Sequence, residues 1–482
     1  MYYINKILLN MSTRIENFSE WYQETIKNAD LADNSDVRGC MVIKPYGFAI
    51  WENIQKIFDA RIKQLGVQNA YFPLLIPLDF IAKEASHIDG FAKECAVVTH
   101  HRLISDGKGG LIPDGKLENP FVIRPTSEAI IGKTVSNWIQ SYRDLPMKLN
   151  QWCNVMRWEM RPRMFLRTSE FLWQEGHTIF ETENEAREDA QKMHQEYYDF
   201  IANSLCIYGL KGEKTDEERF PGAVNTYTIE TMTQDGKALQ MATSHYLGQS
   251  FSTAFDIKFL GRENAQQKSF TASWGMSTRL IGGLIMGHSD DNGLILPPAI
   301  APFKVVILPM LRGEETAQKV KDFCNKIKDK LSAMNISNFI DLSEEDNSKK
   351  MWKWIKKGAP IRLEIGPREA ENNNITVARR DIDKNKTTIS FDDIDNIENI
   401  LQDISNNLLA ISKQRHIENT KIIQNIIELE KLFDNNFMGF AKIKKDLTDN
   451  IEFEKICEKF ALSRRCMLIE DDIEFVIVAK SY

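Results

Sequence analysis

The sequence predicts a multidomain protein that combines an α+β region with α/β units. Its 482 residues are too many for one compact core, so two or three domains are expected. From Asn17 to about Pro298, helical periods alternate with short apolar runs bounded by Gly, Pro and Asn. Beyond Pro302, runs of strand length are separated by helical segments, which is typical of a smaller α/β domain.

Charge and cysteine usage exclude several classes of protein. The formal net charge of −7 argues against a protein that holds nucleic acid over its whole surface, although a local basic surface stays open. The 7 cysteines are scattered without close pairs, and no secretory signal precedes them, so we expect a reduced, cytoplasmic protein. No apolar run approaches bilayer length, so no membrane partner is expected.

Four regions follow from these patterns. Residues 1–16 form an N-terminal extension without an assigned function, and residues 17–300 form the large mixed domain. Residues 401–482 form a small C-terminal α/β domain with a long helical stretch through Phe433. Between them, residues 301–400 form an α/β domain with strand 305–308, helix 316–334, strand 338–342, helix 349–357 and strand 361–365.

The residues most typical of a chemical site lie between positions 155 and 175. Arg157 and Glu159 precede a polar loop, and Arg167, Phe171 and Glu175 follow it. The pattern predicts two antiparallel strands, with Arg157 and Glu159 on one face. Guanidinium groups bind phosphates, an aromatic ring stacks on a base, and carboxylates accept from amino groups or hold a metal ion. The alternative is a hairpin whose surface charges form cross-strand salt bridges.

The full spacing resembles motif 2 (residues 155–175) of class II aminoacyl-tRNA synthetases. Residues 41–77, with a helix expected over 41–66, are similar to motif 1, and residues 273–286 are similar to motif 3. The resemblance implies a class II antiparallel sheet with helices, a homodimer built through motif 1, and catalytic roles for Arg157, Arg167 and Arg279. The ATP-binding residues that it implies are Arg157, Glu159, Arg167, Phe171, Gln240, Thr243 and Arg279.

Segments 124–128, 173–177 and 243–248 look like the prolyl-tRNA synthetase family, in the subgroup shared by archaea, the eukaryotic cytoplasm and some bacteria. This likeness implies attachment of proline to tRNA(Pro) through a prolyl-adenylate, with ATP and Mg²⁺ as cofactors. The chemistry agrees, because a secondary ammonium needs an acceptor and an apolar ring needs aromatic walls. Purely structural histidines are the alternative at two positions, His177 and His245. The implied proline site comprises Thr126, Glu128, Arg157, Trp173, Glu175, His177, His245, Ser273 and Trp274.

Two rival functions and one missing segment bear on this expectation. A synthetase for threonine or serine is the nearest rival, but the zinc ligands normal for a threonine enzyme are not found. The other rival is a non-catalytic sensor of uncharged tRNA. Such a protein would not need to retain all of the residues expected to bind phosphates, whereas this chain retains them. Fewer than 100 residues separate Glu175 from Ser273, so no editing domain is expected in this chain.

The region 303–380 carries 16 Lys and Arg against 11 Asp and Glu, a local excess of positive charge. On the strand 361–365, Arg362 and Glu364 face away from the apolar residues. By resemblance to the class IIa anticodon-binding domain, Arg362, Glu364 and Arg368 would contact the anticodon; the alternative is a solvated strand edge. Lysines expected to hold tRNA phosphates are Lys349, Lys350, Lys353, Lys356 and Lys357.

The C-terminal region departs from the family pattern. Relatives with this extension commonly hold structural zinc through four cysteines, whereas only Cys457 and Cys466 lie here. Two thiolates rarely make a closed tetrahedral site, so no structural zinc and no protein-bound metal is expected. The resemblance also brings the terminal Tyr482 toward the active site, although a terminus is ordinarily disordered.

Overall fold

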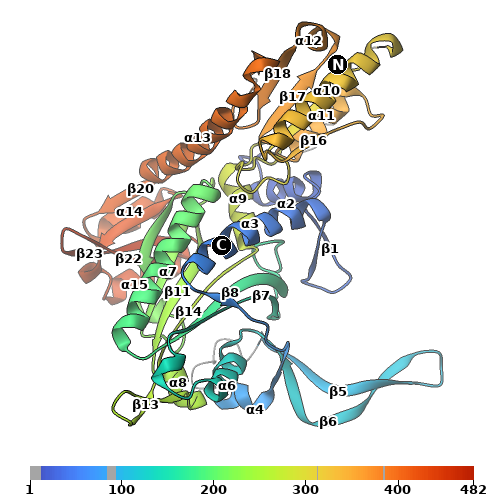
Figure 1. Cartoon of the computed structure of the whole chain (residues 1–482). Helices are drawn as coiled ribbons and strands as arrows, with labels where there is room; N and C mark the ends of the chain where they lie inside the picture. The colour runs from blue at the N-terminus through green and yellow to red at the C-terminus, as the bar shows by residue number, and fades with distance from the viewer. Residues whose placement is uncertain (1–11, 84–93, 312, 384–385) are drawn as a thin grey trace.

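The computed structural model describes residues 12–83, 94–311, 313–383 and 386–482. Most of the predicted N-terminal extension, residues 1–11, therefore lies outside the described residues. Two large sheets, each with its own helices, organise the molecule (Figure 1). Across the described ranges, no helix combines the length and apolar character needed to cross a bilayer.

An eleven-stranded sheet forms the body of the molecule. Its strands are antiparallel, except that β20 pairs parallel with β21 and β3 with β7. Its order is β20 (Thr420–Ile423), β21 (Phe440–Lys444), β23 (Ile473–Ala479), β22 (Ser463–Glu470), β9 (Gly209–Glu213), β10 (Asn225–Met232), β11 (Ala238–Gly248), β14 (Phe270–Ser277), β8 (Glu170–Phe180), β7 (Met147–Met156) and β3 (Gln68–Asn69).

Helix α7 (Glu183–Ser204) covers one face of this sheet (Figure 1). The Tyr197 hydroxyl and the side-chain amide of Gln174 on β8 share a hydrogen bond of 2.6 Å, and Ser244 Oγ on β11 donates to the Ala190 carbonyl. Because strand side chains alternate, the residues on either side of Gln174 and Ser244 point to the other face. That other face is therefore left for the functional site.

Helix α3 (Pro45–Gln64) packs its apolar stripe against α7, where Phe58 stacks on Tyr197 with ring centroids 5.0 Å apart. The predicted helix over 41–66 is wrong at its start, because residues 41–43 form strand β2 (Met41–Ile43) with β1 (Ala32–Asn34). Pro45 occupies the first turn, where its missing N–H leaves no hydrogen bond unmade. Helices α2 (Phe18–Asn28) and α9 (Arg279–His288) complete this core.

A three-stranded sheet lies at the other end of the body and extends away from it as a long hairpin (Figure 1). It contains β4 (Leu75–Pro77), β6 (Leu111–Ile123) and β5 (Ala96–Ser105). Smaller elements nearby are α4 (Leu78–Lys83), α6 (Glu128–Trp138), α8 (Ser250–Phe255), β12 (Lys258–Leu260) and β13 (Gln266–Lys268). Short 3₁₀ turns lie at η2 (Tyr142–Asp144), η3 (Asp216–Glu218), η4 (Phe391–Asn396) and η5 (Lys445–Leu447).

The second sheet confirms the α/β pattern predicted beyond residue 302. Its order is β16 (Asn338–Ile340), β15 (Val305–Pro309), β17 (Ile361–Ile365), β18 (Asn374–Arg379) and β19 (Lys386–Ser390). The first three strands are parallel, and β18 and β19 are antiparallel to their neighbours, so the sheet is mixed. Helices α10 (Glu314–Ala333), α11 (Asn347–Lys356) and α12 (Pro367–Asn372) connect the strands.

The C-terminal region differs from the expectation in two ways. The predicted long helix through Phe433 is interrupted: α13 (Ile397–Glu418) ends, β20 pairs with β21, and α14 (Ile426–Asp434) begins a new helix. The region also does not form a sheet of its own, because β22 pairs with β9 and the C-terminal strands extend the eleven-stranded sheet. Helix α15 (Ile451–Phe460) covers its outer strands. Together with the antiparallel core and the mixed sheet, this confirms the predicted α+β and α/β architecture.

Candidate active site

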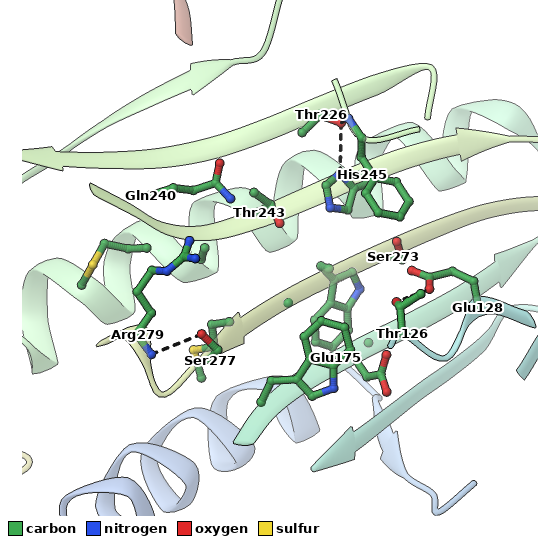
Figure 2. A pocket seen from close by; sticks show the side chains of 18 of the residues that line it. Thr126, Glu128, Glu175, Thr226, Gln240, Thr243, His245, Ser273, Ser277 and Arg279 are labelled. Carbon is green, nitrogen blue, oxygen red and sulfur yellow. Dashed lines mark hydrogen bonds between the residues drawn. The ribbon is translucent and has the colours of Figure 1, made fainter. Parts of the chain in front are cut away.

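A cavity of about 340 Å³ lies over β8, β10, β11 and β14 (Figure 2). Thr126 and Glu128 stand at one end of the view, while Gln240 and Arg279 stand at the other. Most of the residues singled out from the sequence line this single space: Thr126, Glu128, Arg157, Phe171, Trp173, Glu175, His177, Gln240, Thr243, His245, Ser273, Trp274 and Arg279.

A second cavity of about 190 Å³ adjoins the first. Arg157, Phe171 and Arg279 line both cavities, so they mark the boundary between the two spaces. The second cavity adds Glu159 and Arg167, which the first does not contain. Every site residue predicted for the large domain therefore lines one of the two adjoining cavities.

Strand pairing accounts for this convergence. β7 and β8 are antiparallel with Val155 opposite Phe171, as the sequence predicts for this hairpin. Phe171 and Glu175 are four residues apart on β8, so their side chains point to the same face of the sheet and line the same cavity. One detail of the prediction is wrong: β7 ends at Met156, so Arg157 and Glu159 lie beyond the strand. The Arg157 amide still donates to the Ser169 carbonyl, which keeps its side chain beside the return strand.

The end of the cavity that holds Glu128 is rich in buried acceptors. Glu128 begins helix α6, is only 8% exposed, and accepts a hydrogen bond from the Thr126 hydroxyl. Glu175 is also buried, and its Oε1 accepts from Ser127 Oγ and from Gln151 Nε2 at 2.8 Å. A small cation with several N–H donors would find acceptors here, since buried carboxylates need such partners.

The pKa values of the two histidines of the cavity shift in opposite directions because their partners differ. Burial opposes protonation of His177, but its bond to Glu175, 3.2 Å from Nε2 to Oε2, raises the pKa of His177 above the ordinary 6.5. Burial and then the charge of His177 lower the pKa of His245 to about 3. His245 pairs with the neutral Thr226 hydroxyl at 3.0 Å. The Glu175 carboxylate thus favours the protonated form of His177, whereas burial favours the neutral form of His245.

This pair contributes stability over a limited pH range. Burial opposes ionisation of Glu175, but hydrogen bonds led by that from His177 hold its pKa below the ordinary 4.5. Its contribution is present above pH 4.5 and is lost as pH falls through the lowered pKa. The contribution of His177 is present below pH 6.5 and is lost as pH rises through the raised pKa. Both contributions are complete between these two limits.

Cationic side chains gather where the two cavities meet. The Arg157 guanidinium lies 5.4 Å from the Trp173 ring centroid and 5.9 Å from that of Phe171, while its Nε donates to the Pro125 carbonyl. Burial lowers the pKa of Arg157, and burial followed by the charge of Arg167 lowers that of Arg279 to about 10. Like charges held together this way favour a polyanion, because it relieves their repulsion.

The sequence analysis missed one part of the wall. Residues 214–221, between β9 and β10, contribute Lys214, Glu218, Arg219 and Phe220 to the large cavity. They carry no strand or helix periodicity that would point to a site. The run of consecutive charged residues at 216–219, directly before Phe220 and Pro221, was the available signal, and only the folded chain brings this segment over β10.

Arg362 and Glu364 lie in the second sheet, far from this cavity in the fold. The solvated-edge alternative is wrong for them, because β17 lies between β15 and β18 and Arg362 is only 6% exposed. Glu364 pairs with Lys386, and Arg362 Nε and Nη1 have no hydrogen-bond partner among the described residues. Burial lowers the pKa of Arg362 to about 10. Arg368 is exposed on α12.

The lysines expected to hold phosphates are largely engaged elsewhere. Lys350 is buried and donates to the Asp341 carbonyl. Lys353 pairs with Asp341 and Glu345, and Lys357 pairs with Asp30 of the large domain. Of the set, Lys349 is the most open, with its side chain 69% exposed. Lys350 and Lys357 are therefore structural, which contradicts the sequence expectation for these two.

Comparison with known proteins agrees with the geometry. A model of the tRNA synthetase class II core domain (G, H, P, S and T) matches residues 114–288, and one of the anticodon binding domain matches residues 304–399. The proline–tRNA ligase of Bdellovibrio bacteriovorus is 52% identical over 441 residues, covering 89% of this chain and 88% of that protein. The chain belongs to the proline–tRNA ligase family.

Further members of the proline–tRNA ligase family extend the likeness over nearly the whole chain. The enzyme of Akkermansia muciniphila is 50% identical over 475 residues, covering 94% of this chain and 92% of that protein. The crystal structure of the prolyl-tRNA synthetase of Cryptosporidium parvum, complexed with halofuginone and AMPPNP, superposes with a TM-score of 0.89 at 33% identity. It covers 98% of this chain and 99% of that one. As a proline–tRNA ligase, the enzyme joins proline to tRNA, which removes the threonine, serine and sensor alternatives.

The histidine charges give a direct test. Glu175→Gln removes the carboxylate that offsets burial of His177, so we expect the pKa of His177 to fall below 6.5 while His245 stays neutral. NMR titration of the imidazole Cε1 protons measures both values. Glu170→Gln, at the exposed end of the same strand, should leave them unchanged. A His177 pKa equal in the wild type and Glu175→Gln would contradict the assignment.

Proposed function

We propose that the enzyme activates proline with ATP in the two adjoining cavities and passes the prolyl group from a prolyl-adenylate to tRNA(Pro). The observation that supports this most is the place of Arg157, which lines both cavities between the acceptor-rich end and the second cavity. One guanidinium at that boundary reaches both a carboxylate and an α-phosphate through paired bonds.

Each end of the larger cavity suits one part of the substrates. Thr126 and Glu128 take the proline ammonium, and Trp173 and Trp274 provide aromatic walls for its ring. The remaining members of the predicted proline site, Glu175, His177, His245 and Ser273, shape the same wall. Phe171, Gln240 and Thr243 contact the nucleotide, while Arg167 and Arg279 hold its phosphates.

The chemical step follows from this placement. A proline carboxylate oxygen attacks the α-phosphorus, the bond to the bridging oxygen breaks, and pyrophosphate leaves with the electron pair. A hydroxyl of the terminal tRNA ribose then attacks the acyl carbon and AMP leaves. Positioning and charge stabilisation by Arg157, Arg167 and Arg279 supply the catalysis. Proline and ATP held in adjoining spaces replace a chance encounter by one fixed geometry.

The residues present fit magnesium held mainly by the nucleotide. The described residues contain no group of three or more His, Cys, Asp or Glu side chains placed to bind a metal. Mg²⁺ commonly uses one or two carboxylates together with substrate phosphates, and Glu159 in the second cavity is the carboxylate for that role. When bound, the ion neutralises phosphate charge.

The central prediction concerns Arg157. ATP–pyrophosphate exchange with each of the twenty amino acids should respond to proline, and Arg157→Ala should lower this exchange by about 100-fold or more, because charge at the α-phosphate goes unmatched. Circular dichroism should show the fold intact. Arg161→Ala, exposed in the same loop, is the matched control and should retain exchange. Exchange near the wild-type rate in Arg157→Ala would defeat the proposal.

We also propose that the enzyme belongs to the subgroup shared by archaea, the eukaryotic cytoplasm and some bacteria, without an editing domain. The interval between β8 and β14 supports the absence of an editing domain, because it contains α7, α8, strands β9 to β11 of the eleven-stranded sheet and the two-stranded sheet of β12 and β13. The likeness to the Cryptosporidium parvum enzyme over 98% of this chain adds to it, and the enzymes of Bdellovibrio bacteriovorus and Akkermansia muciniphila would be bacterial members of the same subgroup.

A missing editing activity has a measurable consequence. A pocket for an apolar ring gains only about 1–3 kcal/mol against alanine, so some alanyl-tRNA(Pro) should form. We expect it to persist when incubated with the purified enzyme, at the rate of spontaneous hydrolysis in buffer. Release of free alanine is followed with labelled alanyl-tRNA(Pro), and release faster than in buffer would contradict the proposal.

For the second sheet we propose that Arg362, Glu364 and Arg368 contact the anticodon. Nε and Nη1 of Arg362 and Oε1 of Glu364 have no hydrogen-bond partner in the part of the chain that the structure describes, and this supports the proposal, because buried polar atoms normally have partners. Arginine suits the acceptor edge of guanine, and a carboxylate accepts from its N–H groups. Binding of one base would satisfy both side chains.

The corresponding variants separate tRNA binding from proline activation. Glu364→Gln should lower kcat/KM for tRNA(Pro) by about tenfold or more, because a bidentate base contact is worth about 1–3 kcal/mol. Proline-dependent pyrophosphate exchange should be unchanged. Asp329→Asn, at an exposed carboxylate on α10, is the control for general loss of a negative charge. Equal aminoacylation by wild type and Glu364→Gln would refute the contact.

Several further assignments complete the proposal. Residues 17–300 would form the catalytic domain, 301–400 the anticodon-binding domain and 401–482 the C-terminal domain. A homodimer through motif 1 is supported by exposed apolar side chains after α3, at Tyr71, Leu75 and Leu78.

Free thiols at all seven cysteines are typical of a cytoplasmic enzyme. Burial raises the pKa of Cys457 to about 12, which disfavours the thiolate that zinc requires.

A further inference from the structure

A buried ion network lies where the C-terminal domain joins the central sheet. Glu230 on β10 is fully buried, and Lys214 and Arg465 beside it are 3% and 9% exposed. The seam is tight: a Cβ added at Gly212 would lie 2.6 Å from Cys466 Cβ. Glu230 and Lys214 belong to the catalytic domain, whereas Arg465 is on β22 of the C-terminal domain.

The hydrogen bonds tie these three residues into one unit. Glu230 Oε1 accepts from Lys214 Nζ at 2.8 Å, and Glu230 Oε2 accepts from Arg465 Nη2 at 2.9 Å and Nε at 3.1 Å. Lys214 Nζ also donates to the Arg465 carbonyl at 2.7 Å. Two cations therefore share one carboxylate, which leaves a surplus positive charge at a buried position.

This network adjoins the end of the cavity assigned to phosphates. Lys214 lines the large cavity, and Glu230 lies opposite Gln240 in the strand register. Figure 2 places Gln240 beside Arg279, away from Thr126 and Glu128. Burial and Arg167 are the main causes that lower the pKa of Arg279, but Glu230 raises it and Arg465 lowers it, so the network acts electrostatically on Arg279.

We propose that Arg465 is a positioning residue of the C-terminal domain that holds Glu230 and thereby Lys214 at the wall of the ATP-phosphate end of the cavity. The inference rests on the proposed function, which assigns phosphates to that end. With Arg465 present, the Glu230 carboxylate is shared between two cations. Part of the positive charge of Lys214 therefore remains available to attract an anion. Without Arg465, the Glu230 charge falls on Lys214 alone, and a buried carboxylate binds its single cation strongly.

A purely structural role for Arg465 would stabilise the seam without affecting nucleotide binding. The neighbouring Arg464 provides the comparison, because its Nη2 donates to Glu454 and to the Thr448 carbonyl, both in the C-terminal domain, while only its charge acts on Glu217 of the segment 214–221. Loss of Arg465 removes a buried ion pair of β22, and loss of Arg464 removes a partly exposed one. Only loss of Arg465 removes a hydrogen-bond partner of Glu230 on β10.

The test measures the KM for ATP and for proline by pyrophosphate exchange in the full-length enzyme. Arg465→Met should raise the KM for ATP by about tenfold, within the usual range for coupled sites, and change the KM for proline by less than about twofold. Arg464→Met should change neither. Arg465→Lys should restore most of the ATP affinity, since it retains a cation beside Glu230.

A double-mutant cycle identifies the route of the effect. In Glu230→Gln, which keeps the side-chain shape, a further Arg465→Met change should have little additional effect on the KM for ATP. If Arg465→Met does not fold, as judged by thermal unfolding, Arg465→Gln takes its place, with the same expected rise in the KM for ATP and with Arg464→Gln as the comparison. Equal ATP constants for the Arg464 and Arg465 variants would overturn the inference. Loss of proline dependence in the wild type would instead overturn the proposed function.

Discussion

The site depends on the hydrogen-bonded register of β8, β14 and β11. Neighbouring strands lie about 4.8 Å apart and side chains alternate between faces, so the ladder fixes which residues meet over the sheet. Glu175 lies opposite Gly275, Ser273 opposite His245, and the chain within β8 brings Phe171 and Glu175 to one wall. A slip of one residue would turn these side chains toward α7 and remove the site. Packing of α7 on the opposite face therefore stabilises the strand register on which the site depends, as well as the core.

The second feature of the site is charge held in place before substrate arrives. Burial lowers the pKa of both Arg157 and Arg279, because removal from water disfavours a charged guanidinium. In the proposed function, a bound triphosphate would offset this effect, and the two guanidinium groups are already in place before it binds. At the other end, His177 already has a carboxylate partner, because its Nε2 lies 3.2 Å from Glu175 Oε2.

The three parts of the chain are joined by specific polar contacts. Arg380 of the second sheet donates to both carboxylate oxygens of Asp290, directly after α9, and the Tyr46 hydroxyl on α3 donates to the Lys357 carbonyl. The C-terminal strands continue the catalytic sheet, and the terminal Tyr482 hydroxyl donates to Asp235 next to β11. Tyr482 also lies under the guanidinium of Arg163, in the loop that carries Arg167. These contacts connect elements to which the proposed function assigns different parts of the substrates.

The sequence by itself determined the hairpin of motif 2, the strand alternation at Phe171 and Glu175, and the α/β order beyond residue 302, because these follow from local periodicity and spacing. It could not determine that Arg362 is buried, that Lys350 and Lys357 are paired, or that β22 adds to the catalytic sheet. Each of these depends on which surfaces meet, and no local pattern encodes that. Lys214 is the clearest example: only the closing of β9, β10 and β22 around Glu230 places it at the cavity, because a charge is buried only where the folded chain supplies its partner.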